Sequence, residues 1–265
     1  MSLRICVAGA TGWTGRAVAE GVLAADDLTL VAGVSRSGAG RDLGTLWGGS
    51  ANSVPVHGCV VDALDGVDVL VDYTSHTAVL DHTRFALERG VAVVIGSSGL
   101  AAPDYAEIDR AATDGEVGVV AAGNFSLTGA LAQAAAVLAA RHLPSWEIVD
   151  YAAASKPDAP SGTARELAER LAEVHTPAVE LTVAETVGPL EARGARVAGT
   201  QVHSVRLPGH VLSVETVFGL PDERLTIRHD AGSSATPYVA GTLLAVRAVV
   251  SRVGLTRGLD TLLLT

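Results

Sequence analysis

Short, almost wholly apolar runs alternate with longer mixed stretches through the first half of the chain. The runs predicted to be strands are residues 3–9, 28–35, 67–74, 91–98 and 116–124. The stretches predicted to be helices are about Trp13–Ala25, His76–Arg89 and Pro103–Asp114. Parallel strands that are buried on both faces have this continuous apolar character, and helices connect them. The pattern therefore predicts an α/β fold with a doubly wound parallel sheet.

After Asn124 the pattern changes. An Ala-rich helix is predicted over about Thr128–Arg141, then a strand at 145–155 and a helix after Pro160. Four later runs partly alternate polar with apolar residues, namely 179–185, 200–207, 210–219 and 223–230. Such alternation is typical of antiparallel strands with one exposed face. We expect a second, α+β domain with a mixed or mainly antiparallel sheet, and a final helix, Pro237–Arg252, that returns to the first domain.

The composition narrows the class of protein. Hydrophobic residues make up 48% of the chain and charged residues 18%, and no run of eighteen residues is uninterruptedly apolar. The N-terminus lacks the basic and apolar regions of a signal peptide. The formal net charge is −10 without a basic run, and Cys6 and Cys59 are too few and too far apart for a metal site or a disulfide framework. We therefore expect a soluble, cytoplasmic protein with no nucleic-acid, membrane or metal partner.

A glycine-rich loop, "GATGWTGR", follows the first predicted strand and opens a helix. In this setting Gly9 permits a tight turn, Gly12 lets a pyrophosphate approach the backbone, and Gly15 allows the helix to pack closely on the strand. The helix N-terminus then offers N–H groups to the phosphate. The residues expected to contact a dinucleotide here are Gly9, Ala10, Thr11, Gly12, Trp13, Thr14 and Gly15. The alternative is a tight strand-to-helix turn without a ligand.

The end of the second predicted strand indicates which dinucleotide binds. An NAD site normally has an acidic residue there, which holds the ribose 2′-hydroxyl. This chain has Ser35 and Arg36 instead, so nothing repels a 2′-phosphate and Arg36 is placed to pair with one. The sequence predicts NADPH as the cofactor, with NADH as the possible second cofactor. The alternative is that Arg36 is an ordinary solvated loop residue.

Two further loops follow buried strands. They are "IGSSG", which contains Gly96, Ser97 and Ser98, and "GNFSLTG", which begins with Gly123, Asn124 and Phe125. Both lie where the carboxyl ends of parallel strands meet a cofactor. We expect their backbone groups to face a nicotinamide or a substrate, although loops without a ligand would have a similar composition.

The stretch "SKPDAPSGTA" holds Lys156, the only lysine in a chain with eighteen arginines. Lysine can give up a proton whereas arginine stays charged, so a single retained lysine is a candidate proton donor. Ser161, Gly162 and Thr163 open a helix, whose N–H groups and hydroxyls would hold a carboxylate. Ser161 fits equally well as a plain N-cap, and chance survival of one surface lysine is the other alternative.

These motifs together resemble the dihydrodipicolinate reductase family. "VAGATGWTGR", "VDYT", "IGSSGL", "GNFSLTG" and "SKPDAPSGTA" occur in that family's order and spacing over nearly the whole chain. The resemblance implies a Rossmann-like cofactor domain (residues 1–124 and 232–265) and an α+β domain for substrate binding and oligomerisation (residues 125–231). It also implies NAD(P)H reduction of a cyclic unsaturated imine dicarboxylate in lysine (diaminopimelate) biosynthesis.

The family resemblance assigns a role to each motif. Residues Gly9 to Gly15 would hold the pyrophosphate and Arg36 the adenosine ribose end. The residues that would surround the nicotinamide are Gly96, Ser97, Ser98, Gly123, Asn124 and Phe125. Lys156 would donate the proton, while Gly162 and Thr163 would hold a substrate carboxylate. The resemblance further implies a homotetramer, for which the apolar positions Val202, Val205 and Leu207 of the second sheet are candidates.

One departure leaves the substrate open. The family usually has two histidines at the positions that Ala153 and Ala152 occupy here, and the segment "GHVLSVE" also differs from the family pattern. The small side chains would leave space for a bulkier or less acidic imine. Three alternatives remain, namely the lysine-pathway reductase, a diverged imine reductase of another pathway, and a non-catalytic NADP(H) sensor. A short-chain dehydrogenase is excluded, because Tyr151 and Lys156 are five residues apart rather than four.

Overall fold

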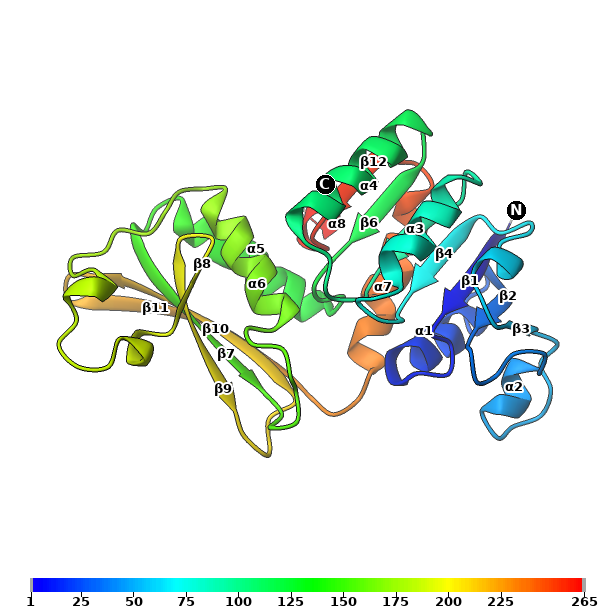
Figure 1. Ribbon diagram of the computed structural model, residues 1–265, viewed down its shortest axis with the longest axis horizontal. Coiled ribbons are helices and arrows are strands. Elements are labelled where there is room, and N and C mark those ends of the chain that lie inside the picture. The colour runs from blue at the N-terminus through cyan, green and yellow to red at the C-terminus, as the bar shows by residue number, and fades with distance from the viewer. Residues whose placement is uncertain (1, 264–265) are drawn as a thin grey trace. The chain divides into compact units, whose positions relative to one another are not determined.

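The computed structural model describes residues 2–263. The chain forms two compact units, one that runs to Leu127 and resumes at Ala235, and one that comprises Thr128–Ser234 (Figure 1). The boundaries expected from the sequence, 124/125 and 231/232, lie three residues before each of these divisions. We call the two units the cofactor unit and the substrate unit, after the ligands proposed for them below.

The cofactor unit is built on a seven-stranded parallel sheet. Its strands are β1 (Leu3–Ala8), β2 (Leu28–Val34), β3 (Val56–His57), β4 (Val69–Asp72), β5 (Ala92–Ile95), β6 (Gly118–Ala121) and β12 (Gly254–Arg257). The strand order is β12-β6-β5-β4-β1-β2-β3, and every neighbouring pair is parallel. All residues of β4, β5 and β6 are buried. The predicted doubly wound parallel sheet is confirmed, and the strand order reverses between β1 and β4.

Helices pack against this sheet. They are α1 (Trp13–Leu23), α2 (Leu43–Leu46), α3 (Val79–Leu87), α4 (Ala102–Asp114), α7 (Thr236–Val249) and α8 (Asp260–Leu263), with a 3-10 turn at Val61–Ala63. Helix α1 packs beside α7, and α3 packs beside α4. The chain therefore returns from the substrate unit through α7, as predicted, and then adds β12 beside β6. The sequence did not predict β12, because its four residues are only partly buried beyond the first.

The substrate unit has a five-stranded mixed sheet. Its strands are β7 (Ser145–Ala152), β8 (Ala195–Val197), β9 (Thr200–Arg206), β10 (Leu212–Leu220) and β11 (Glu223–Ala231). In the order β11-β10-β7-β9-β8 the pair β7–β9 is parallel and the other pairs are antiparallel. Helices α5 (Leu127–Ala140) and α6 (Gly162–Ala172) cover one face. The core between helices and sheet includes Trp146, Ile148, Leu167, Leu171 and Phe218.

The strand expected at residues 179–185 is wrong. Only a 3-10 turn at Val183–Glu185 forms there. The Glu185 carboxylate accepts hydrogen bonds from the backbone and the hydroxyl of Thr182 (2.9 and 2.6 Å), and such local bonds compete with strand pairing. Val179 and Leu181 are about half exposed (51% and 52%), so no sheet covers the apolar positions that suggested a strand. A second 3-10 turn, Leu190–Arg193, follows, and β8 pairs with β9 instead.

The apolar positions expected on the open face of this sheet do not all lie there. Val202 is 2% exposed and belongs to the core beneath the helices. Leu207 follows the end of β9 and is exposed. Val205 is partly buried and, three residues from Val202 in a strand of period two, points to the opposite face. The expected continuous stripe is therefore wrong for Val202, and the open face is less apolar than the sequence suggested.

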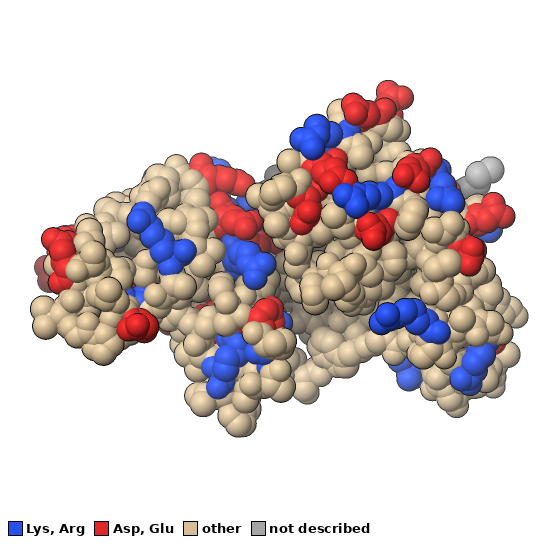
Figure 2. Space-filling model, viewed as in Figure 1, with Lys and Arg blue, Asp and Glu red and all other residues tan. Residues whose placement is uncertain are grey.

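The surface carries charges of both signs. Figure 2 shows acidic and basic side chains interspersed on the face in view, as expected from a chain with 19 basic and 29 acidic residues. Within residues 2–263, no helix combines the length and the apolar character that a membrane crossing requires.

Candidate functional site

The glycine loop between β1 and α1 is held by close backbone contacts. Gly9 has a positive φ of 81° and donates its N–H to the carbonyl of Val34 at the end of β2 (2.9 Å). A Cβ at Gly15 would overlap the carbonyl oxygen of Gly9, whereas a Cβ at Gly12 would lie 3.2 Å from that oxygen. Gly9 and Gly15 are therefore required by the fold itself. Gly12 is not, and its missing side chain keeps the start of the helix accessible.

The N-terminus of α1 is open to an anion. Its N-cap is Gly12, no side chain caps it, and its first turn contains no acidic residue. Uncapped N–H groups with the helix dipole behind them favour a phosphate. Thr11 lies in the same loop, and its Oγ1 is 2.8 Å from Oγ of Ser35 at the end of β2. The remaining loop residues of the sequence prediction are Ala10, whose carbonyl accepts from Nε1 of Trp47 (3.1 Å), Trp13 and Thr14, which begin α1.

Arg36 lies directly beyond β2 and is exposed. Its side chain has no ion pair or hydrogen bond among the described residues, and no acidic residue stands between it and Val34. The carboxyl end of β2 therefore offers a hydroxyl, Ser35, and an exposed cation, Arg36, where an NAD site would offer a carboxylate.

The loop after β5 is tied to a buried carboxylate that sequence reasoning missed. Asp72, the last residue of β4, is fully buried. Its Oδ1 accepts from Oγ of Ser97 (2.6 Å) and from both the N–H and the hydroxyl of Thr74 (3.0 and 2.7 Å). Its Oδ2 lies 2.7 Å from Nδ1 of His82 on α3. A buried charge needs such partners, and they fix Ser97 and hence the backbone of the loop.

Gly96 and the residues around Tyr73 define the other side of this loop. A Cβ at Gly96 would overlap the ring of Tyr73. The Tyr73 hydroxyl is 2.7 Å from Oγ1 of Thr242 on α7, and burial raises the pKa of this phenol. The ring also packs edge-on against Phe125. Ser97, rather than the next residue Ser98, is the serine that binds Asp72.

Asn124 has an amide nitrogen without a partner. Its Oδ1 accepts from the N–H of Ser126 (2.8 Å), whereas its Nδ2 is buried and has no acceptor within the described chain. Gly123 precedes it at the end of β6, and Phe125 is buried beside it. A buried hydrogen-bond donor without an acceptor is uncommon in proteins, and a bound ligand would explain it by supplying the acceptor. A carboxamide such as that of nicotinamide supplies one.

The residues of the cofactor unit thus fit a nicotinamide dinucleotide. The uncapped α1 N-terminus suits the pyrophosphate, the missing Cβ of Gly12 gives it room, and the orphan Nδ2 of Asn124 suits the carboxamide. All three lie at the carboxyl ends of β1 and β6, where such ligands bind in open α/β sheets.

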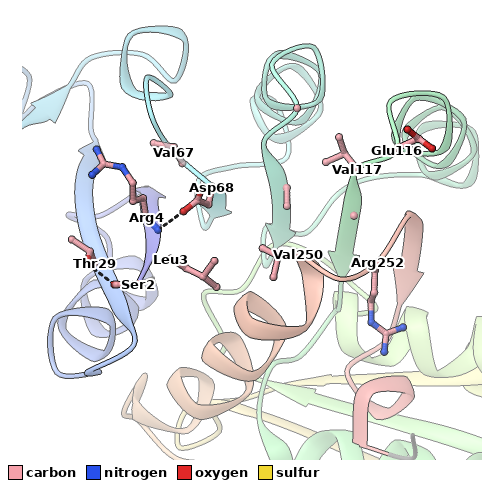
Figure 3. A pocket seen from close by; sticks show the side chains of 13 residues that line it. Ser2, Leu3, Arg4, Thr29, Val67, Asp68, Glu116, Val117, Val250 and Arg252 are labelled. Carbon is pink, nitrogen blue, oxygen red and sulfur yellow. Dashed lines mark hydrogen bonds between the residues drawn. The ribbon is translucent and has the colours of Figure 1, made fainter.

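A large hollow of about 800 Å³ lies at the opposite end of the same sheet (Figure 3). Its lining includes Arg4, Asp68, Glu116 and Arg252. Arg4 is the second residue of β1, and the other three lie just before β4, β6 and β12. The N–H of Arg4 donates to Asp68 (2.8 Å). Because dinucleotides bind at the carboxyl ends, size alone does not make this hollow the cofactor site.

In the substrate unit the single lysine is paired. Nζ of Lys156 lies 2.8 Å from Oδ1 of Asp158, and the two side chains are 33% and 32% exposed. The N–H of Lys156 donates to the carbonyl of Ala153, one turn earlier (3.0 Å). Sequence reasoning quoted Asp158 within the motif but gave it no role. Because Lys156 and Asp158 are separated only by Pro157, their spacing could have indicated this ion pair.

Ser161 is committed to the protein itself. Its hydroxyl donates to Oδ1 of Asp150 (2.7 Å), its N–H donates to Oδ2 (2.8 Å), and its Oγ accepts from the N–H of Ala164 as the N-cap of α6. The fully buried Asp150 is also paired with Nη2 of Arg206 (2.7 Å). The geometry therefore favours the N-cap alternative for Ser161. Asp150 and Arg206 are further residues that the sequence did not single out.

Gly162 and Thr163 form the first turn of α6, which contains no acidic residue. Gly162 is half-buried and Thr163 is 7% exposed. The helix start with Lys156 upstream provides one dipole end and one cation for a carboxylate. The anion site at Gly162 and Thr163 stays a prediction, and Ser161 caps the helix at which it would lie.

The two alanines at the end of β7 differ in their surroundings. Ala152 is fully buried, so its small side chain opens no space to solvent. Ala153 is half-buried, and its N–H points to the carbonyl of Val211 (3.4 Å). His210, on the turn before β10, stacks on Tyr151 with the ring centroids 5.2 Å apart. Any enlarged space at this strand end is therefore beside Ala153 only.

Comparisons with known proteins agree over the whole chain. The family model of the dihydrodipicolinate reductase N-terminus matches residues 3–125, and that of the C-terminus matches residues 125–263. The 4-hydroxy-tetrahydrodipicolinate reductase of Moorella thermoacetica is 38% identical over 270 residues, with 99% of this chain and 98% of that protein covered. The enzyme of the same name from Corynebacterium diphtheriae is 38% identical, with 98% of each covered.

Solved structures give the same answer for the fold. Dihydrodipicolinate reductase from Paenisporosarcina sp. TG-14 with dipicolinate bound superposes with a TM-score of 0.78, at 29% identity and with 98% and 99% of the two chains covered. Amine dehydrogenase from Mycobacterium smegmatis, at 17% identity and a TM-score of 0.66, with 97% and 95% covered, shares the fold alone. With both family models matched end to end and relatives at 38% identity over nearly full length, the chain belongs to the dihydrodipicolinate reductase family.

Proposed function

We propose that this chain is an NAD(P)H-dependent reductase of a cyclic unsaturated imine dicarboxylate, of the 4-hydroxy-tetrahydrodipicolinate reductase type. The observation that carries the proposal is the start of α6, where an acid-free helix N-terminus follows a lysine held by Asp158. The full-length family match and the dipicolinate bound to a structural relative support a planar dicarboxylate as the ligand class.

The cofactor unit binds and orients the dinucleotide. When bound, the cofactor supplies a hydride. The Gly9–Gly15 loop holds the pyrophosphate by backbone N–H groups, and the loops at Gly96–Ser98 and Gly123–Phe125 flank the nicotinamide. Nδ2 of Asn124 donates to the carboxamide, which satisfies its unmet hydrogen-bonding capacity.

We propose NADPH as the preferred cofactor, because Arg36 has no ion pair among residues 2–263 and the residues directly after β2, Ser35 and Arg36, include no acid. Arg36→Ala should weaken NADPH binding about tenfold, the scale of one charge-assisted hydrogen bond, and leave NADH binding unchanged. The measurement is Kd for both cofactors by fluorescence titration. Tighter binding of NADH by the wild type, with no effect of Arg36→Ala, would contradict the assignment.

The substrate unit binds the carboxylate and delivers the proton. The N–H groups at Gly162 and Thr163 hold one carboxylate of the substrate, and Ser161 fixes this turn through Asp150. Lys156 stabilises the negative charge that hydride addition creates, and then donates a proton from Nζ to it. Arginine would perform only the first task. With alanines at 152 and 153, no imidazole extends from the end of β7 to share it.

A broader substrate range is the second candidate. Ala153 is half-buried and carries no titratable group where the family usually has histidine, so the pocket suits an imine that needs less acid catalysis or more room. A cyclic imine monocarboxylate tests this candidate against the dicarboxylate. A kcat/KM higher for the monocarboxylate would identify a diverged imine reductase.

We further propose that the enzyme is a cytoplasmic homotetramer. The open face of the substrate unit's sheet, with the partly buried Val205, supports association. Light scattering at micromolar protein should give four times the chain mass of 26.9 kDa, and a monomer would contradict the proposal.

The decisive experiment follows NADPH oxidation with 4-hydroxy-tetrahydrodipicolinate as substrate. We expect turnover by the wild type and a loss of about 10²–10⁴-fold in Lys156→Ala, with NADPH affinity retained. Lys156→Arg should be nearly as slow, because arginine gives up no proton. Near-wild-type rates in Lys156→Arg would reduce the lysine to an electrostatic anchor. No turnover by the wild type on either imine would contradict the proposed function.

A further inference from the structure

The lysine of the proposed proton transfer is at the end of a continuous chain of polar contacts. Asp150 is fully buried in β7, and its Oδ2 pairs with Nη2 of Arg206 on β9 (2.7 Å). The same Nη2 donates to the backbone carbonyl of Asp158 (2.7 Å). The carboxylate of Asp158 in turn holds Nζ of Lys156 (2.8 Å). A strand in the core is thereby connected to the ammonium through three side chains.

Arg206 is the central residue of this chain of contacts, and it is fixed by further hydrogen bonds. Arg206 also donates from Nη1 to the carbonyls of Asp150 and Val205 (3.3 and 3.0 Å), so its guanidinium is fixed to β7 and β9. Because the guanidinium is planar, it holds two acceptors in a defined geometry. The carbonyl of Asp158 therefore has a fixed position relative to the sheet.

Lys156 has no other ion-pair partner in the part of the chain that the structure describes. Its four-carbon side chain loses considerable rotamer freedom if held in one place. A one-third exposed ion pair contributes little to stability. The Lys156–Asp158 pair is therefore better explained by placement of the ammonium than by stabilisation of the fold.

We propose that Asp158 is a positioning residue, which aims the Lys156 ammonium, and that Arg206 and Asp150 fix Asp158 for this purpose. The proposal rests on the proposed function for its catalytic part. Misplacement of a reacting group by about 1 Å costs on the order of 10²-fold in rate.

The unique lysine provides a direct test that needs neither substrate nor cofactor. An amine-selective acylating reagent modifies only Lys156 and the α-amino group, because the chain has no other lysine. The reagent must reach the Lys156 amine, which the ion pair with Asp158 holds in one place. In Asp158→Asn, which keeps the shape of the side chain and the backbone carbonyl, we expect labelling of Lys156 to be several-fold faster, with the α-amino group as the internal reference. Mass spectrometry of the peptide that contains Lys156 gives the rate.

The matched control is Asp222→Asn, on the exposed turn between β10 and β11, where labelling should stay at the wild-type rate. In the same protein samples, Asp158→Asn should lower kcat about tenfold to hundredfold, with NADPH Kd and the unfolding midpoint unchanged. Asp158→Glu retains the charge and should recover part of kcat.

Two outcomes would overturn the proposal. Equal labelling rates in wild type and Asp158→Asn would show that the carboxylate does not control the amine. Faster labelling with an unchanged kcat would show that placement by Asp158 has no catalytic role. If the wild type reduces no cyclic imine, the proposed function fails separately, and the labelling rate still decides whether Asp158 controls Lys156.

Discussion

The two units each fix a site loop with a fully buried aspartate near the end of a strand, but they neutralise it differently. Asp72 in the cofactor unit and Asp150 in the substrate unit both accept a serine hydroxyl, from Ser97 (2.6 Å) and Ser161 (2.7 Å). The remaining oxygen of Asp72 faces His82, whereas that of Asp150 faces Arg206. A histidine can be neutral or charged, and an arginine is always charged.

This difference predicts how much stability each unit loses when its buried aspartate is removed. If the Asp72 carboxylate is lost, Thr74, Ser97 and His82 lose their shared acceptor, and none of these side chains is permanently charged. If the Asp150 carboxylate is lost, the Arg206 guanidinium stays charged beneath the loop, with 16% of its side chain exposed. We therefore expect the fold of the substrate unit to depend more strongly on Asp150 than the fold of the cofactor unit depends on Asp72.

The largest expected effect comes from removal of these two carboxylates in parallel. Asp150→Asn should destabilise the substrate unit by about 3–5 kcal/mol, because it breaks a buried ion pair and leaves one charge without its partner. Asp72→Asn should cost about 1–3 kcal/mol, the scale of an impaired buried hydrogen-bond group. Urea unfolding, with hydrogen exchange read on peptides of β7 and β4, measures both. A larger loss in Asp72→Asn would contradict the comparison.

A smaller effect is expected in the glycine loop, which no ion pair holds. Gly15→Ala places a Cβ against the carbonyl of Gly9 and should destabilise the cofactor unit by about 1–3 kcal/mol through overpacking. Gly12→Ala, whose Cβ would lie 3.2 Å from that oxygen, should destabilise the unit less than Gly15→Ala, because this contact is closer to an ordinary van der Waals distance.

The readout that distinguishes the two glycines is cofactor affinity. Gly12→Ala should weaken NADPH binding at least tenfold, because its methyl group occupies the approach of the pyrophosphate. The measurement is NADPH Kd by fluorescence titration, with urea unfolding of the same samples. Unchanged affinity in Gly12→Ala would remove the pyrophosphate from this loop.

The sequence predicted features that depend on neighbouring residues better than features that depend on contacts between distant residues. The parallel sheet and the glycine loop were predictable, because buried apolar strands and a Gly9–Gly15 pattern are local signals. The strand expected at 179–185 failed because alternation was counted without burial, and Thr182 and Glu185 satisfy each other locally. The order of the second sheet, with its parallel β7–β9 pair, depends on contacts between distant residues.

The sequence predicted the motifs of the candidate site, but not the buried residues that hold these motifs in position. Lys156, Gly162 and Thr163 lie in one quoted stretch, so spacing alone brought them together. Asp150 and Arg206 are 56 residues apart, and no periodicity links them. The sequence could name the groups that we propose to face the ligands, whereas the buried Asp150–Arg206 pair could be found only from the fold.

The smallest expected effect concerns the pH dependence of stability in the substrate unit, where a histidine is buried. His229 on β11 lies beneath the helices, opposite Val214, and burial lowers its pKa below the ordinary 6.5. A folded-state pKa below the unfolded value means that the unfolded chain binds the proton more readily, so stability falls as the pH drops below about 6.5.

His229→Gln removes this titration. Between pH 7.5 and 5.5 we therefore expect the unfolding midpoint of the wild type to fall more steeply than that of His229→Gln, with His142→Gln, an exposed histidine after α5, behaving like the wild type. Equal slopes in wild type and His229→Gln would show that the pH dependence of the substrate unit arises elsewhere.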